Sequence, residues 1–263
     1  MAFRHSIFIF LCLSIFISCR KEPESIPEPV EEQAIETSVP SLSKYSGFWL
    51  SESYVNAIKN LKSVDSATFV QKSMAIGFRI IPDTISNKSA LLNVLWHSEG
   101  STERVYADDN QMLYFNPPRP DYPLKPFIIG LKNNKMELEF PDTGKKEYYL
   151  RYENQYQALN QLLFAGKYRD AITNVAIELT EGGKVSGITD VITYNPVFQF
   201  DESNIEGVDV LFFYNGEKRS EKMGYDYQLA YQYKFEGDTL KLYEVPENYG
   251  IEPGPLKYKL VKR

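Results

Sequence analysis

The sequence predicts an all-β protein built from antiparallel meander barrels, and two observations carry this prediction. Apolar and polar residues alternate along 135–140 (KMELEF) and most clearly along 225–235 (YDYQLAYQYKF), as strands with one buried and one wet face require. Asn133-Asn134, Gly182-Gly183 and Asn215-Gly216 separate such runs, and these residues tolerate the positive φ of tight hairpins. Short strands joined by hairpins favour a meander that closes into a barrel or folds into a sandwich.

The composition supports a folded body and excludes two classes of protein. Of 263 residues, 43% are hydrophobic, which is enough for a core and argues against a wholly disordered chain. The 29 Lys and Arg are outnumbered by 35 Asp and Glu, giving a formal net charge of −6. General nucleic-acid binding needs a basic surface, so we expect no nucleic-acid partner.

Residues 1–18 are expected to form an export signal. Arg4 precedes an apolar run over 7–17 that only Ser14 interrupts. This run is shorter than the ~20 apolar residues of a membrane-spanning helix and matches the hydrophobic part of a signal peptide.

The end of this segment resembles the lipobox of bacterial lipoproteins, because Phe16-Ile17-Ser18 precedes Cys19. Phe16 stands where that family usually has Leu. The resemblance implies that Cys19 becomes the first residue of the mature chain and carries fatty acids such as palmitate. Arg20, in place of Asp, implies sorting to the outer membrane. The alternatives are a secretory signal with an incidental Cys and an uncleaved anchor.

Residues 19–44 are expected to be the lipidated Cys and a disordered tether, because residues 20–44 contain four Pro and six Glu. Prolines stiffen such a segment and like charges extend it. At ~3.1 Å per residue, it could reach on the order of 80 Å.

The body is expected to hold two tandem modules, a first β module over 45–152 and a second over 165–263, linked by a helix over 153–164. The linking segment has Leu and Tyr at helical spacing and ends before Gly166. A short helix is also predicted over 51–62, after the first strand. The sequence YSGFW at 45–49 is echoed by FAGKY at 164–168. One continuous barrel with similar strands is the alternative.

The opening Gly47-Phe48-Trp49 resembles the Gly-x-Trp motif of lipocalins and related calycin barrels. The closing strand at 256–261 is similar to that of small bacterial lipocalin-like lipoproteins. The resemblance implies structural roles for Gly47 and Trp49, with Trp49 packed across the closed base of a barrel. The helix at 51–62 departs from the lipocalin pattern.

The mature chain offers little for catalysis or metal binding. Cleavage would leave Cys19 as the only Cys and His97 as the only His, so neither a Cys-based metal site nor a two-His site fits one protomer. We expect no catalytic residue, no metal and no cofactor. Carboxylates at Asp108-Asp109, at Glu137 and Glu139, and at Asp201-Glu202 keep a glycan hydrolase or an accessory domain open as an alternative.

Binding residues are expected on the loops and on the aromatic strand face. The proline-rich loop 116–127 would display Tyr122 and Phe127. Tyr225, Tyr227, Tyr231 and Tyr233 would line a barrel interior, either as packed core or as the wall of a cavity. The expected function is non-catalytic binding of a small amphiphilic ligand or an envelope protein. A solid barrel acting as an interaction or inhibitor module is a further alternative.

Overall fold

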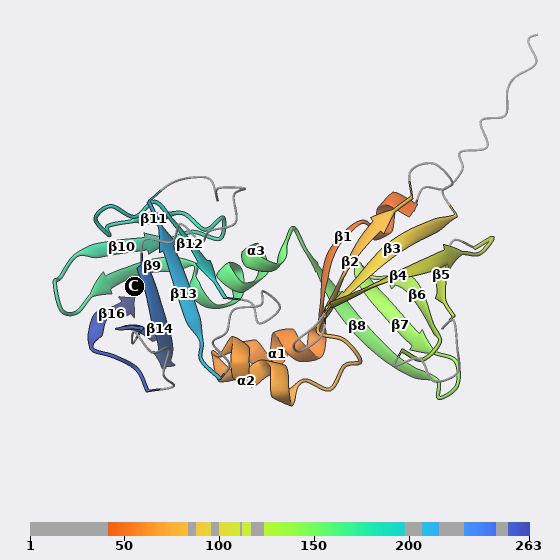
Figure 1. The fold of residues 1–263 in the computed structure, drawn as a ribbon, viewed down its shortest axis with the longest axis horizontal. Helices are drawn as coiled ribbons and strands as arrows, with labels where there is room; N and C mark the ends of the chain where they lie inside the picture. Colours follow the sequence, from red (N-terminus) through yellow and green to blue (C-terminus); the bar gives the residue numbers. More distant parts are fainter. Residues whose placement is uncertain are drawn as a thin grey trace, which may run out of the picture. The chain divides into compact units, whose positions relative to one another are not determined.

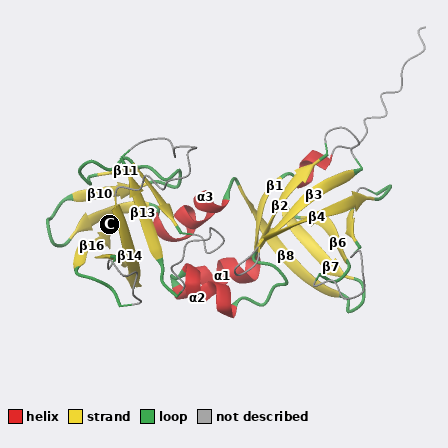
Figure 2. Ribbon diagram, viewed as in Figure 1, coloured by secondary structure: helices red, strands yellow, loops and turns green. Residues whose placement is uncertain are grey.

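The structure is a computed structural model. It describes residues 42–83, 88–95, 100–110, 112–116, 124–197, 207–215, 229–245 and 252–263. Residues 39–263 cluster into one unit. It contains two eight-stranded antiparallel barrels with a short helical segment between them (Figure 1, Figure 2). The predicted all-β fold with two barrels is confirmed.

The first barrel is a closed meander in which each strand pairs with the next and β1 pairs with β8. Its strands are β1 (Gly47–Ser51), β2 (Gly77–Pro82), β3 (Ser89–Leu95), β4 (Gly100–Ala107), β5 (Leu113–Phe115), β6 (Phe127–Lys132), β7 (Lys135–Phe140) and β8 (Lys145–Tyr152). A 3-10 turn, η1 (Leu42–Tyr45), precedes β1. Side chains fill the interior, and its largest buried members are Trp49, Tyr45, Tyr149, Phe78 and Phe127.

Two helices, α1 (Glu52–Leu61) and α2 (Val64–Val70), lie in the connection from β1 to β2. The Ser51 hydroxyl caps α1 by accepting the N–H of Tyr54 at 3.0 Å. Lys62 then adopts the left-handed conformation that ends the helix, with φ of 55°. The helix predicted over 51–62 is therefore present. The second helix was not predicted.

The second barrel has the strand order β11-β10-β9-β16-β15-β14-β13-β12. Its edges meet at a bridge between Lys184 and Thr193, where the Tyr194 N–H donates to the Gly183 oxygen at 2.7 Å. The strands are β9 (Gly166–Asp170), β10 (Ala176–Leu179), β11 (Val185–Ser186), β12 (Thr193–Pro196), β13 (Val210–Tyr214), β14 (Leu229–Glu236), β15 (Thr239–Glu244) and β16 (Leu256–Lys262).

The segment between the barrels is helical, as predicted, although not throughout an α-helix. It comprises α3 (Gln155–Leu159) and a π-helical turn, η2 (Asn160–Phe164). In η2 the Ala165 N–H reaches back five residues to the Asn160 oxygen at 2.7 Å.

One apolar core joins the helices to the interior of the second barrel. Phe48 and Leu50 alternate with the inward-facing Trp49 on β1, so they leave the first barrel and enter this second core. There they belong to the same buried cluster as the α1 residue Ile58 and aromatics of the second barrel. The rings of Phe164 on η2 and Tyr233 on β14 lie 4.9 Å apart, edge to face.

At the start of the first barrel, Trp49 is held by contacts with Tyr45 and Arg151, which we call the opening clamp. The indole Nε1 donates to the Tyr45 oxygen four residues earlier, at 2.9 Å. Arg151 lies opposite Trp49 on β8, with its guanidinium 5.6 Å from the Trp49 ring centroid. It also donates to the Ser46 oxygen at 2.6 Å. Gly47, the residue after Ser46, has a φ of 129°, and any other residue there would place its Cβ 3.1 Å from the Arg151 Nε.

The second barrel repeats this clamp with other residues. The Tyr168 hydroxyl donates to the Phe164 oxygen, again four residues earlier, at 2.6 Å. Lys262 lies opposite Tyr168 on the last strand and donates to the Ala165 oxygen at 3.2 Å. The short echo of YSGFW in FAGKY thus corresponds to one hydrogen-bonding arrangement built twice.

The described residues contain no helix that is long and apolar enough to cross a membrane.

Candidate binding site at the mouth of the first barrel

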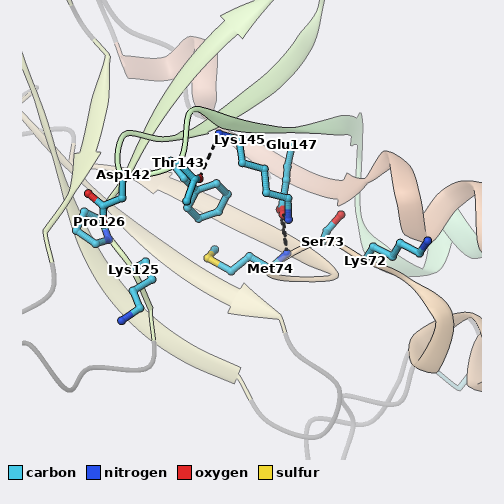
Figure 3. A pocket seen from close by; sticks show the side chains of 10 residues that line it. Lys72, Ser73, Met74, Lys125, Pro126, Asp142, Thr143, Lys145 and Glu147 are labelled. Carbon is cyan, nitrogen blue, oxygen red and sulfur yellow. Dashed lines mark hydrogen bonds and ion pairs between the residues drawn. The ribbon is translucent and has the colours of Figure 1, made fainter.

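A pocket of about 380 Å³ lies at the end of the first barrel where β1 stops and α1 begins. Three separate segments form it: the stretch after α2, the residues before β6, and the turn from β7 into β8 (Figure 3). Its lining residues are Lys72, Ser73, Met74, Lys125, Pro126, Phe140, Asp142, Thr143, Lys145 and Glu147.

The floor of the pocket is apolar and continuous with the barrel core. Met74 and Phe140 pack against the buried cluster of the first barrel. The Phe140 ring lies 6.4 Å from that of Phe127, which stacks on Phe115 inside the barrel. Pro126 completes the apolar wall. The strands therefore present a hydrophobic surface at the mouth without opening the filled interior.

Glu147 links two of the segments that form the pocket, and its carboxylate accepts hydrogen bonds from three groups. Its side chain accepts the Met74 N–H at 2.9 and 3.1 Å, Lys145 Nζ at 2.7 Å and the Tyr149 hydroxyl at 3.0 Å. Figure 3 shows the bond from the Met74 backbone. Burial, followed by the nearby Glu147 charge, raises the pKa of Tyr149 well above its ordinary value. Glu147 thus fastens the stretch after α2 to β8.

Lysines stand at the rim of the pocket, and Figure 3 shows the side chains of Lys72 and Lys125 on different sides of Met74 with their ammonium groups directed outward. Lys72 and Lys125 are exposed and form no ion pair with any described residue. Lys145 adds a third ammonium, 5.9 Å from the Phe140 ring centroid. The pocket lining also contains two carboxylates. Glu147 is already ion-paired with Lys145, and Asp142 lies in the β7–β8 turn. An apolar floor below several cations suits a ligand with an apolar body and an anionic group.

An adjoining hollow of about 320 Å³ shares Lys72, Ser73, Lys145 and Glu147 with this pocket and reaches Glu52 and Asn56 on α1. The mouth therefore continues as a depression along the start of β8, which would accommodate a ligand longer than the pocket itself.

The predicted loop residues are only partly described. Phe127 is 1% exposed and packs inside the first barrel, so it faces the core and not solvent. Tyr122 lies outside the described residues. The neighbours of Phe127, Lys125 and Pro126, line the pocket instead.

The predicted tyrosine face belongs to the packed core where it is described. Tyr231 and Tyr233 are 3% and 2% exposed, and Tyr233 donates to Asp209 Oδ1 at 3.2 Å. Neither lines a described pocket. Tyr225 and Tyr227 lie outside the described residues, as do His97 and Cys19. Gly47 and Trp49 lie in the opening clamp.

The paired carboxylates on β7 are occupied by a cation. Lys146 Nζ lies 2.7 Å from Glu137 and 2.9 Å from Glu139. The hydrogen bond from Lys146 lowers the pKa of Glu137, whereas a general acid for glycoside hydrolysis needs a raised one. Within the described ranges, no group of three His, Cys, Asp or Glu is placed to hold a metal ion.

Comparisons with protein-family models, curated proteins and solved structures found no match for this chain.

Proposed function

We propose that this chain is a bacterial lipoprotein, held at the outer membrane by acylated Cys19, which binds a small anionic amphiphile without catalysis. The observation that carries the binding proposal is the pocket at the mouth of the first barrel. Its floor of Met74, Pro126 and Phe140 would take the apolar part of the ligand. The ammonium groups of Lys72 and Lys125 would take the anionic part.

The envelope location is supported by the sequence of the first 44 residues. A short apolar run followed by Ser18-Cys19 fits export and acylation. Several acyl chains hold a protein at a membrane far better than one. Substitution of Cys19 by Ser should abolish labelling by radioactive palmitate. Continued labelling of that variant would refute the anchor.

Charge reversal at the rim tests the binding site. The Lys72→Glu/Lys125→Glu variant should bind a fluorescent fatty acid at least tenfold more weakly, because hydrogen bonds to charged groups contribute about 1.5–3 kcal/mol each. The Lys59→Glu/Lys132→Glu variant is the matched control, since both of its lysines are exposed and lie outside the pocket. Equal affinity in both variants would refute this site.

The filled interiors also favour a second candidate, a solid-barrel module that binds an envelope protein. Native mass spectrometry of the Cys19→Ser protein, purified from its host, separates the two candidates. A mass that denaturation releases supports the amphiphile. A bare protein mass, together with no fatty-acid binding in solution, supports the interaction module.

A further inference from the structure

Three lysines stand side by side across the outer face of the second barrel. Lys234 on β14 is in register with Lys241 on β15, and Lys241 is in register with Lys259 on β16. Their chain neighbours Tyr233, Leu240 and Leu260 are at most 2% exposed and point inward. Because side chains alternate along a strand, all three lysines point outward.

This arrangement costs stability, and within the described part of the chain an ion pair offsets that cost only at the central lysine, Lys241. Like charges directly opposite on neighbouring strands repel. Lys241 pairs with Glu236, but Lys234 and Lys259 form no ion pair with any described residue. Lysines often protect exposed sheet edges from aggregation, yet these three lie on strands that are paired on both sides. Protection of an edge therefore does not explain the row.

The positive character continues onto the neighbouring strand β9, which pairs with β16. Lys167 and Arg169 alternate there with the buried Tyr168 and Asp170, so they share the outer face. A hollow of about 390 Å³ lined by Arg169, Lys262 and Arg263 lies at this edge of the row. Strands β9, β14, β15 and β16 together carry seven Lys or Arg against three Asp or Glu, whereas acidic residues predominate in the whole chain.

We propose that this face, formed by the outer side of β9 and β14–β16, docks on an anionic lipid surface. A row of amines across a sheet can meet many phosphates at once, as the headgroups of a membrane present them. The chain as a whole is acidic, which disfavours a nucleic acid. The choice of lipid rests on the proposed envelope location. The docking itself does not depend on Cys19 acylation, so it can be tested without the anchor.

The test is co-sedimentation of the full chain carrying Cys19→Ala with vesicles of phosphatidylcholine alone or mixed with phosphatidylglycerol. The apolar segment 7–17 can bind both vesicles, so the measured quantity is the gain caused by phosphatidylglycerol. We expect a clear gain at low salt that ~0.5 M NaCl removes, because salt screens exposed charges. A binding constant unaffected by phosphatidylglycerol would overturn the proposal.

Lysine substitutions assign the gain to this face. Lys234→Gln/Lys241→Gln/Lys259→Gln should reduce phosphatidylglycerol-dependent binding by on the order of 100-fold. The matched control, Lys59→Gln/Lys132→Gln/Lys184→Gln, removes the same charge from exposed positions elsewhere and should retain most of the binding. An equal loss in both variants would overturn the assignment.

Two further readouts keep the outcomes distinct. The melting temperature of the row variant should be nearly unchanged, because relief of the repulsion between neighbouring lysines offsets the loss of the Lys241–Glu236 ion pair. Binding that heparin or duplex DNA elicits but phosphatidylglycerol vesicles do not would overturn the lipid assignment. Palmitate labelling of the unsubstituted chain reports separately on the anchor.

Discussion

Asp209 connects the second barrel to the helical insertion of the first, and removing its carboxylate should destabilise both. Asp209 Oδ1 accepts the N–H groups of Val64 and Asp65, at 2.9 and 3.0 Å, and the Tyr233 hydroxyl at 3.2 Å. Burial raises the pKa of Asp209, while the hydrogen bonds from Asp65, Ser63 and Val64 oppose that rise. The Ser63 hydroxyl is the N-cap of α2 and accepts the Ser66 N–H at 3.0 Å, and the Asp209 carboxylate adds an acceptor for two further N–H groups of the first turn from a distant part of the chain.

The expected cost of Asp209→Ala follows from these three donors. Loss of a side-chain acceptor at a helix N-terminus costs about 0.5–2 kcal/mol. The buried Tyr233 hydroxyl would lose its acceptor, which costs about 1–3 kcal/mol. The free energy of unfolding should therefore fall by about 1.5–5 kcal/mol. Asp238→Ala, in the exposed β14–β15 turn, is the matched control and should stay within about 0.5 kcal/mol of the unsubstituted protein.

The measurement is urea unfolding followed by tryptophan fluorescence and by far-ultraviolet circular dichroism. Trp49 and Trp96 are the only tryptophans and both precede the second barrel, so fluorescence reports on the first barrel and circular dichroism on both. The two transitions should coincide in the unsubstituted protein, because Phe48 and Leu50 of the first barrel's strand β1 are buried in the core of the helices and the second barrel. In Asp209→Ala the circular dichroism transition should begin at lower urea.

A double-mutant cycle checks the reasoning. Tyr233→Phe removes the hydroxyl that Asp209→Ala leaves without its acceptor. The combined variant should therefore lose less stability than the sum of the single variants, by about 1 kcal/mol. Additivity within about 0.3–0.5 kcal/mol would mean that the two residues are not coupled and would refute this account.

Three further predictions concern the clamps and a buried carboxylate. Trp49→Ala should cost about 3–5 kcal/mol in thermal unfolding, because the ring is 1% exposed, and an unchanged midpoint would exclude its packing role. Tyr168→Phe removes only the hydroxyl that donates to the Phe164 oxygen, and it should lower the free energy of unfolding in urea by about 1–3 kcal/mol. An unchanged free energy of unfolding would mean that this hydrogen bond does not stabilise the second barrel. Burial opposes ionisation of Asp170, but its hydrogen bonds, led by that from Thr173, lower its pKa below 3.8. The ionised Asp170 therefore stabilises the folded protein above pH 3.8, and this stabilisation is lost as the pH falls through the lower pKa of the folded state. Asp170→Asn should therefore weaken the dependence of the free energy of unfolding on pH in the acid range.

The strands could be predicted because their signal is local. Residues 135–140 alternate strictly and form β7 with those bounds. The tyrosine-rich run forms β14 from Leu229 onward, although Gln232 breaks the expected pattern by being 2% exposed. The helix α2 has only seven residues, which is too short for a helical period to stand out.

The candidate site could not be predicted because its residues come from distant segments. Lys72, Lys125 and Lys145 have no shared motif, and each looks like an ordinary solvated lysine in the sequence. The barrel brings them together only when β6 and β8 take their places. The aromatic residues that the sequence singled out, among them Phe127 and Tyr233, pack the core where they are described.

The pairing of β9 with β16 has a consequence for the order in which the chain can fold. The first barrel has all of its strands once synthesis has passed Tyr152, and its closing strand β8 follows directly on β7. The second barrel cannot complete its sheet until β16 has been made, because β9 pairs early with β10 but its second partner comes much later, with Asp170 pairing to Leu260, 90 residues further along the chain. Until then, the apolar faces of α1 and α2 lack the core that covers them. A chain released by a ribosome or translocase that stalls within the last strand would thus have a complete first barrel and an open second sheet. The apolar faces of α1 and α2 would be exposed to solvent, and both they and the open sheet would favour aggregation.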